Sequence, residues 1–399
     1  MYEKFAKNEL KNNLFEYATS ELSQDAFICW LASYAHEEAE KDAALNECAR
    51  KMLEMFVPEF EGKNFKLLNV ERQVDKIDVL LTVECEKKVY KIIVEDKTYT
   101  SEHDNQLKRY VDGLAEKHEE NTVIVKGVYY KTGFQSDLSS VEDAHYEIIS
   151  REKMLNLMQQ YVDKTNNQIF ISYYNYWNSK QKLVETFKTL PVVDWSWWAV
   201  YGFYDYLHKE LQGKKLGSWY GYVANPSGGF HALSVWVLDN EDRIYLNNEN
   251  KVIVDKEELK KYNDADKQNE KVDETFKYKY SFYFHIRTTL KNGKIKAIIV
   301  DWKIENYLKV NESNSLTKEE RRKLYKEMRD EFIKLLENNN VKLEKISRIG
   351  NGKCVTLGSI CLDKNGNYEN LKEEIFNISD KYNEILKKIK NQIGDKDDK

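Results

Sequence analysis

Residues 76–110 read KIDVLLTVECEKKVYKIIVEDKTYTSEHDNQLKRY and carry the pattern of a β-hairpin followed by a helix. Two runs rich in valine, isoleucine and leucine, at 77–84 and 89–96, have strand character, and the CEKK segment predicts a turn that joins them. The preceding segment 65–74 also has the composition of a strand. The sequence therefore predicts three short strands in succession, of which the last two form a hairpin.

Three charged residues occupy positions of this hairpin that a sheet usually gives to apolar side chains. Because alternate residues of a strand share a face, Glu95 and Lys97 point the same way, and antiparallel pairing brings Asp78 near Glu95. Unpaired burial of such charges is costly. A divalent cation would offset this cost, because Mg²⁺ prefers oxygen ligands from one or two carboxylates. We expect Asp78 and Glu95 to hold Mg²⁺, with Mn²⁺ as a substitute and the backbone carbonyl of Asp96 as a further ligand.

This arrangement fits the hydrolysis of a phosphodiester. A bound metal ion polarises the phosphate and lowers the pKa of a coordinated water. Lys97 would orient that water or help to deprotonate it, and would offset charge in the transition state. The alternative is a surface hairpin with a Glu95–Lys97 salt bridge, because an isolated E-x-K is short and common.

The order of the motifs favours the metal site over the salt bridge. An aspartate on the previous strand, the apolar run KIIV before E-x-K, and a following helix with QLKRY occur in succession. Residues four apart share a helical face, which can turn toward the strand ends. In this respect residues 20–160 resemble the PD-(D/E)XK nuclease superfamily, in its RecB-like branch with a Q-x-x-x-Y motif. The residues that match its motifs are Asp78, Glu95, Asp96, Lys97, Gln106 and Tyr110. The first motif reads KID where the superfamily name has PD.

The resemblance implies an enzyme, a metal-dependent deoxyribonuclease. Gln106 and Tyr110 would position the site or the DNA backbone, and Glu21 would assist metal binding from the upstream helix. A carboxylate that only serves the helix dipole is the alternative for Glu21. Superfamily members take part in bacterial restriction, repair and phage defence, so a defence role with a partner protein or self-association is implied. Two other functions stay open: an RNase with the same site, and a catalytically silent nuclease fold that binds nucleic acid or a partner.

The expected fold class is α/β. Up to residue 162 the predicted order is α, α, β, β, β, α, β, β, α, with a helix at 43–56 and another that starts near Ser101. This order agrees with the α-β-β-β-α-β core of the restriction-endonuclease-like fold, a mixed sheet flanked by helices. We expect a nuclease core at 1–162 and a second, α+β region at 163–399 that binds substrate or a partner.

The second half of the chain offers weaker signals. Asn292-Gly293 predicts a type I′ hairpin turn, and 317–339 an amphipathic helix. The aromatic run at 194–211 has helical spacing, so packing is favoured over base stacking. The three tryptophans concerned are Trp195, Trp197 and Trp198.

Basic residues and histidines add candidates for contact with phosphate. Strand 276–287 would carry one polar face, for which solvent exposure is favoured over phosphate contact. The residues of that face are Lys277, Lys279, His285 and Arg287. The histidines considered as auxiliary groups are His36, His103 and His231.

The composition limits the kinds of protein that this chain can be. The net charge of −5, from 62 basic and 67 acidic residues, leaves room for a local basic path without indicating a wholly basic binder. There is no apolar run of about 18 residues and no signal-peptide core, so we expect a cytoplasmic protein that does not bind membranes. Five cysteines without a CxxC pair favour buried thiols over a zinc site.

Overall fold

The chain divides into two compact units, Met1–Glu185 (unit 1) and Thr186–Lys399 (unit 2). This boundary lies later than the predicted one at 162, so helix α6 (Gln168–Glu185) belongs to unit 1. The computed structural model describes residues 12–18, 20–39, 41–102, 105–115, 123–214, 216–223, 229–237, 243–247, 252–253, 276–306, 317–338, 343–348 and 354–394.

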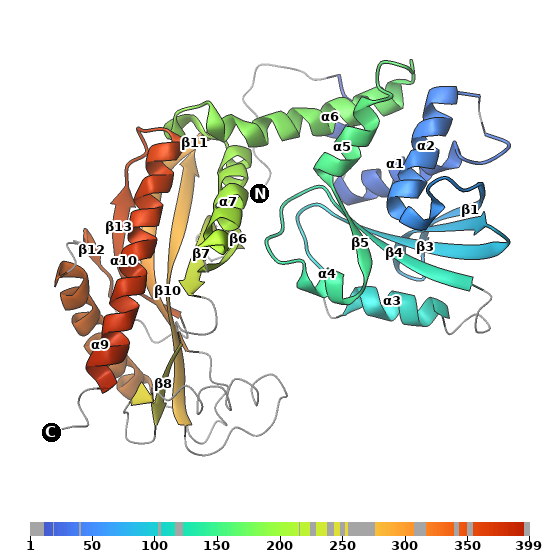
Figure 1. Ribbon diagram of the computed structural model, residues 1–399. Coiled ribbons are helices and arrows are strands. Elements are labelled where there is room, and N and C mark those ends of the chain that lie inside the picture. The colour runs from blue at the N-terminus through green and yellow to red at the C-terminus, as the bar shows by residue number, and fades with distance from the viewer. Residues whose placement is uncertain are drawn as a thin grey trace. The chain divides into compact units, whose positions relative to one another are not determined.

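Unit 1 is built on a mixed sheet of five strands in the order β1-β2-β3-β4-β5 (Figure 1). The first three strands are antiparallel to one another, and β3, β4 and β5 are parallel. The strands are β1 (Phe65–Val74), β2 (Ile77–Cys85), β3 (Lys88–Lys97), β4 (Val123–Lys131) and β5 (Tyr146–Ser150). The predicted α/β class and the order α-β-β-β-α-β are thereby confirmed.

The hairpin of β2 and β3 has a turn of two residues. Glu86 and Lys87 both have positive φ, 49° and 65°, which is the backbone of a type I′ turn without its usual glycine. The register pairs Val79 with Val94, so Asp78 and Glu95 stand opposite each other at the open end of the hairpin. This is the pairing that the strand alternation predicts.

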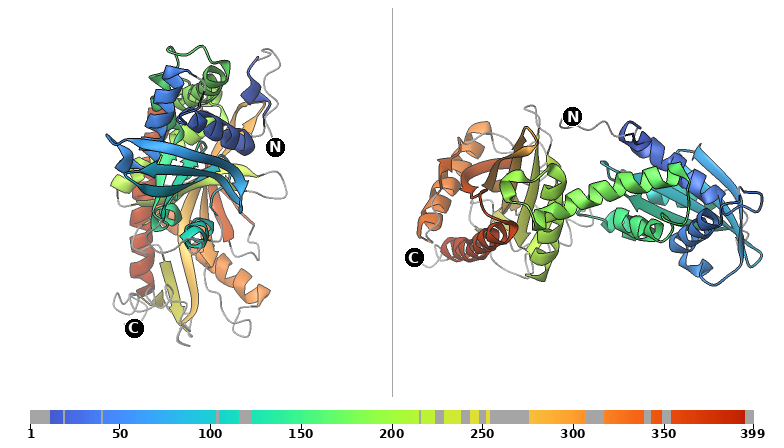
Figure 2. Two further views of the ribbon diagram at one scale, coloured as in Figure 1. Left: turned by 90° about the vertical axis from the view of Figure 1, so that its right-hand side faces the viewer. Right: turned by 90° about the horizontal axis from the view of Figure 1, so that it is seen from above.

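Helices cover both faces of the sheet (Figures 1 and 2). On one face Leu80 and Ile93 belong to an apolar cluster with Leu107 and Leu114 of α3. On the other face α1 contacts β1, β2 and β3, and Phe27 stacks on Tyr173 of α6. The helices, apart from α6, are α1 (Ser20–Ser33), α2 (Ala43–Phe56), α3 (Gln106–Ala115), α4 (Ser139–Asp143) and α5 (Arg151–Gln159).

Helix α3 begins at Gln106, five residues after the predicted start near Ser101. Asn105, directly before it, has a positive φ of 55°, which a right-handed helix does not allow, so α3 does not extend back through this residue. The helix prediction was therefore wrong at its start.

Unit 2 contains an antiparallel sheet in the order β12-β13-β11-β10-β7-β6, with β8 paired to β10 and β9. Helices α7 and α10 lie on one face of it (Figure 1), where the hydroxyls of Tyr204 and Tyr382 donate to the carbonyls of Ile286 and Phe282 on β10. The strands are β6 (Leu216–Val223), β7 (Phe230–Val237), β8 (Arg243–Asn247), β9 (Val252–Ile253), β10 (Phe276–Lys291), β11 (Lys294–Asn306), β12 (Lys345–Ile346) and β13 (Cys354–Leu362). The helices are α7 (Trp197–Gly213), α9 (Lys318–Asn338) and α10 (Tyr368–Gly394).

Several local predictions for unit 2 are confirmed. Asn292 and Gly293 both have positive φ and join β10 to β11, and α9 follows the predicted amphipathic pattern. Trp195 and Trp198 are buried, as packing requires. The cysteines are only partly as expected, because Cys354 and Cys361 are exposed.

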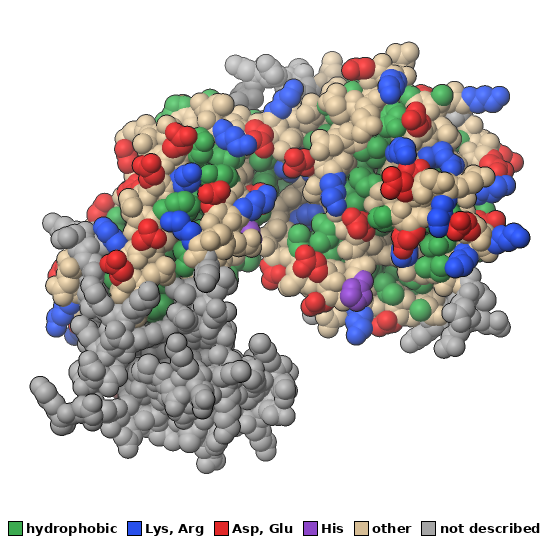
Figure 3. Space-filling view, in the orientation of Figure 1, with side chains coloured by type: hydrophobic (Ala, Val, Ile, Leu, Met, Phe, Trp, Pro, Cys, Tyr) green, Lys and Arg blue, Asp and Glu red, His purple; other side chains and the backbone are tan. Residues whose placement is uncertain are grey.

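The described surface of unit 1 mixes charges of both signs in the view of Figure 3. Among the described residues no helix is both long and apolar enough to cross a membrane.

Candidate metal centre

The open end of the hairpin gathers the predicted charged residues. Nζ of Lys97 lies 2.5 Å from Oε1 of Glu95 and 3.6 Å from Oδ2 of Asp78. It also donates to the backbone carbonyl of Asp96 at 3.2 Å. Glu95 is fully buried, at 0% exposure, whereas Asp78 is half-buried. The fold therefore places one ammonium against two carboxylates at the ends of β2 and β3.

Helix α3 adds the two residues of the helix motif to the same face. Nε2 of Gln106 donates to Oε1 of Glu95 at 2.8 Å and to the hydroxyl of Tyr110 at 2.6 Å. That hydroxyl donates in turn to the carbonyl of Lys76 at 2.6 Å, in the turn before β2. Gln106 and Tyr110 thus fasten α3 to the hairpin and hold the Glu95 carboxylate in place.

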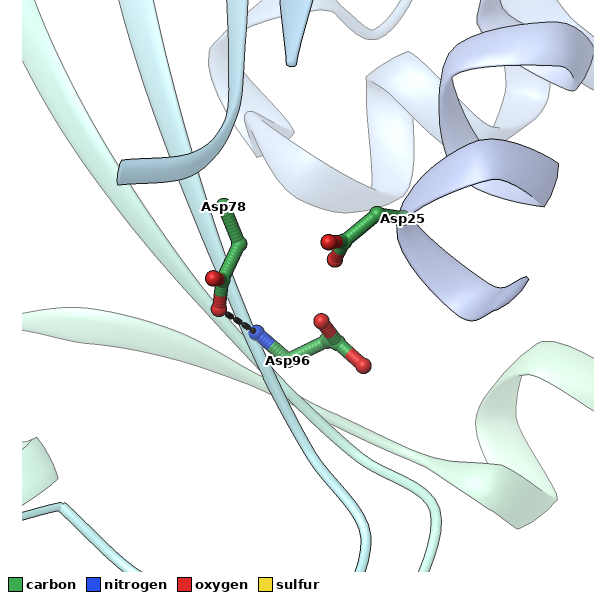
Figure 4. Close-up of side chains that lie close together, drawn as sticks. All are labelled: Asp25, Asp78 and Asp96. Carbon is green, nitrogen blue, oxygen red and sulfur yellow. Dashed lines mark hydrogen bonds between the residues drawn. The ribbon is translucent and has the colours of Figure 1, made fainter. Parts of the chain in front are cut away.

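Asp96 points to the other face of the sheet, as strand alternation requires. There it meets Asp25 of α1, and with Asp78 the three carboxylates form one group (Figure 4). One oxygen of each lies within 4.8 Å of the others, and Asp25 and Asp96 are each only 1% exposed. This buried acidic triad could hold a metal ion.

Each triad member accepts a hydrogen bond, but oxygens remain unsatisfied. Nε2 of Gln73 donates to Asp25 at 2.8 Å and to Asp78 at 3.2 Å, and Nε2 of Gln24 donates to Asp96 at 2.9 Å. The backbone N–H of Asp96 donates to Oδ2 of Asp78 at 3.3 Å.

Three buried carboxylate oxygens have no hydrogen-bond partner within the described structure: Oδ1 of Asp25, Oδ1 of Asp96 and Oε2 of Glu95. Buried acceptors of this kind are rare without a donor or an ion. A hard divalent cation bound by carboxylate oxygens fits this donor set.

The electrostatics show an excess of negative charge. Burial raises the pKa of Asp96, and the neighbouring carboxyl of Asp25 raises it further. Burial, together with the charge of Asp78, raises the pKa of Glu95 to about 7. Burial alone would lower the pKa of Lys97, but the carboxylates of Glu95 and Asp78 outweigh it and raise the pKa. The site is therefore short of positive charge, and Lys97 alone does not neutralise it.

The predicted upstream ligand, Glu21, lies near the site but is engaged elsewhere. Its Oε1 accepts from the backbone N–H of Thr98 at 3.2 Å and from the hydroxyl of Thr100 at 3.1 Å. Asp25, one turn further along α1, is the helix carboxylate that faces Asp78. Sequence reasoning missed Asp25, although the i, i+4 spacing from Glu21 puts both carboxylates on one helical face.

The other predicted auxiliary groups lie in different surroundings. His36 accepts a hydrogen bond from the backbone N–H of Glu38, and His231 is packed against Trp197 and Tyr201. His103 lies outside the described residues.

The polar face of β10 is partly buried, which corrects the expectation of a solvated face. His285 and Arg287 donate to Asp301 at 3.0 and 2.8 Å, and Ser359 donates to it at 2.6 Å. His285 and Asp301 are 5% and 4% exposed. The side chains of Lys277 and Lys279 lie outside the described part of this strand.

Comparison with known proteins yields no match to a family model, to a curated protein or to a solved structure.

Proposed function

We propose that this protein is a divalent-metal-dependent nuclease of the PD-(D/E)XK kind that hydrolyses phosphodiester bonds of DNA. The observation that carries the proposal is the site at the ends of β2 and β3. Asp78 stands opposite Glu95, Lys97 contacts both, and unsatisfied carboxylate oxygens of Asp25 and Asp96 lie behind them. Buried acids gathered around one lysine destabilise the folded state. Their presence therefore supports a role in catalysis.

Two overlapping sets of carboxylates would hold the metal. The triad of Asp25, Asp78 and Asp96 forms one set, and Asp78 with Glu95 forms the set expected from the motif. When bound, Mg²⁺ or Mn²⁺ would polarise the phosphodiester and lower the pKa of a coordinated water.

The chain's own residues would then position the reaction. Lys97 is held by Glu95 and Asp78, so its ammonium would orient the attacking water and offset charge on the phosphate as the P–O bond to the leaving nucleotide breaks. Gln106 keeps the Glu95 carboxylate in place, and Tyr110 anchors Gln106 to the hairpin. Glu21 would act indirectly, by holding the segment that follows β3.

Unit 2 would bind substrate, a partner protein or a second copy of the chain, and a role in phage defence would follow from the resemblance alone. An RNase with this site is the nearest alternative, and a silent nucleic-acid-binding module is the other. The intact set of Asp78, Glu95 and Lys97 disfavours the silent module, because a scaffold has no need of clustered charges.

The deciding experiment is a cleavage assay on supercoiled plasmid, linear duplex, single-stranded DNA and RNA. Each is incubated with Mg²⁺ or Mn²⁺, and with EDTA as the metal-free control. Lys97→Ala should lower cleavage by about 10²–10³-fold, the usual effect of removing one electrostatic contact in a transition state. Lys63→Ala is the matched control, because Lys63 is an exposed lysine paired with Glu86 at the opposite end of the same hairpin.

The substrates and the metal separate the alternatives. Cleavage of RNA alone would replace the DNase by an RNase. Failure to cleave any substrate, with no metal bound in calorimetry, would favour the silent module. Metal binding without cleavage would indicate an enzyme that requires an activating partner.

A further inference from the structure

Gln73, near the end of β1, connects the buried acidic triad (Figure 4) with the surface. Its Nε2 donates to Oδ2 of Asp25 at 2.8 Å and to Oδ1 of Asp78 at 3.2 Å. Gln73 is exposed, whereas Asp25 is 1% exposed and Asp78 is half-buried. The amide of Gln73 therefore lies on the solvent side of two of the three carboxylates.

An unusual backbone conformation brings Gln73 to this position. Gln73 stands opposite Asp78, between two regular pairs of the β1–β2 ladder. Its φ is 55°, in the left-handed region that residues other than glycine rarely adopt. Such a conformation persists only where surrounding contacts hold it, and residues of this kind cluster at functional sites. The bonds to Asp25 and Asp78 are contacts that hold Gln73 in place.

The chemistry of the two partners decides which end of the amide faces them. An ionised carboxylate only accepts hydrogen bonds, so Gln73 must present its N–H groups to Asp25 and Asp78. A neutral amide does not offset their charge, and Oδ1 of Asp25 stays without a hydrogen-bond partner among the described residues. A divalent cation would bind these carboxylates more strongly than the amide does.

A second glutamine contacts the triad from the protein interior. Nε2 of Gln24 donates to Oδ2 of Asp96 at 2.9 Å and to the hydroxyl of Thr98 at 2.7 Å. Gln24 is 1% exposed, and one of its two bonds goes to a residue outside the triad. Both bonds of Gln73 go to triad members, and its side chain borders on solvent. Of the two amides, that of Gln73 is the one that can swing away from the triad.

Resting on the metal site of the proposed nuclease, we propose that Gln73 is a gate that sets the affinity of the triad for a divalent cation. In the metal-free protein the amide bonds Asp25 and Asp78, and it swings into solvent when the cation binds. Because both hydrogen bonds must break first, they oppose metal binding. Gln73 therefore lowers the metal affinity and is not itself a ligand.

The experiment measures binding of Mn²⁺ and of Mg²⁺, each alone, to the full chain by isothermal titration calorimetry. Gln73→Gly removes the amide and suits the positive φ. It should bind metal about 10-fold more tightly, the equivalent of one lost hydrogen bond to a charged group. Gln73→Lys should bind metal about 10-fold more weakly, because an ammonium carries the full charge that the amide lacks and bonds carboxylates more strongly.

Gln160→Ala is the matched control and should bind metal as wild type does. Gln160 is an exposed glutamine at the end of α5, and its amide donates to the backbone carbonyl of Asn156 at 3.3 Å. Cooperative thermal unfolding in EDTA would show that Gln73→Gly folds. If it does not fold, Gln73→Asn takes its place, because asparagine tolerates a positive φ and is too short to reach both carboxylates.

The dissociation constants separate a gate from a ligand. Tighter binding in Gln73→Gly and weaker binding in Gln73→Lys would support the gate. Weaker binding in both variants would overturn it, because Gln73 would then bind the metal through its carbonyl oxygen. Equal affinity of wild type and Gln73→Gly would also overturn it.

Cleavage assays separate the gate from the nuclease. If the protein is a nuclease, Gln73→Gly should reach half-maximal cleavage at an about 10-fold lower Mg²⁺ concentration. The expected shifts in metal affinity without cleavage by wild type would support the gate and overturn the nuclease. Cleavage with equal metal affinities would overturn the gate and leave the nuclease standing. Failure of wild type to bind metal would overturn the gate and the metal site together.

Discussion

Each unit buries negative charge, but the two units do so in opposite ways. In unit 2 the Asp301 carboxylate accepts from His285, Arg287 and Ser359. In unit 1 the carboxylates of Asp25 and Asp96 face each other, and each keeps one buried oxygen without a hydrogen-bond partner among the described residues.

The two environments move the acid pKa values in opposite directions. Burial alone would raise the pKa of Asp301, but the bonds from His285, Arg287 and Ser359 outweigh it and hold the pKa well below its usual range. Burial raises the pKa of Asp96, and Asp25 adds to the rise. The comparison teaches that the protein itself supplies the partners of Asp301, whereas the triad keeps unsatisfied oxygens and could hold a metal ion.

The largest effect on stability is expected when the charge of Asp301, which is fully hydrogen-bonded, is removed. Asp301→Asn should lower the free energy of unfolding of unit 2 by about 1–3 kcal/mol, because it removes the counter-ion of the half-buried Arg287 and weakens the bonds donated by the buried His285 and by Ser359. Urea unfolding followed by the fluorescence of the buried Trp302 would measure it. A loss below about 1 kcal/mol would mean that the ion pair is not a structural element.

The triad of Asp25, Asp78 and Asp96 should instead make the stability of unit 1 depend on a divalent metal ion. Mg²⁺ or Mn²⁺ at 100 times its dissociation constant should stabilise unit 1 by about 2.7 kcal/mol. The double variant Asp25→Asn, Asp96→Asn should lose this stabilisation, and Asp301→Asn should keep it. Thermal unfolding with increasing metal measures the effect. Equal stabilisation of the double variant and the wild type would place the metal elsewhere.

Removal of one charge from the triad should raise the free energy of unfolding, whereas Asp301→Asn should lower it. In metal-free protein, Asp96→Asn should raise the stability of unit 1 by about 1–2 kcal/mol, because it relieves repulsion with Asp25 and Asp78. Denaturant midpoints with EDTA test this. A marked destabilisation would show that the triad is held together without a cation.

The smallest expected effect is the loss of stability of unit 2 at low pH, as the carboxylate of Asp301 becomes protonated. The folded pKa of Asp301 is lowered, so its contribution is present above the unfolded value near pH 4 and is lost as pH falls toward the folded value. Unit 2 should therefore lose about 1 kcal/mol from this group between pH 5 and pH 3. Asp301→Asn should lack this component. If the stability of wild type and of Asp301→Asn fell equally between pH 5 and pH 3, Asp301 would not be the source of the pH dependence.

Local patterns predicted much of unit 1. The hairpin of β2 and β3 follows from two apolar runs and a short turn, and the pairing of Asp78 with Glu95 follows from alternation alone. The start of α3 was wrong because Asn105 adopts a positive φ directly before Gln106, and the capping pattern at Ser101 did not indicate this.

The sequence by itself determined the order of strands and helices, and which side chains share a strand face, because these depend on residues a few positions apart. It also determined that Glu95 and Lys97 lie together. Only the tertiary structure decided that Asp25 faces Asp78 and Asp96, because that depends on how α1 packs across the sheet. The same holds for Asp301 and Ser359, which meet through the pairing of β11 with β13. Helical periodicity and strand alternation define a face, but long-range packing selects the residues that this face meets.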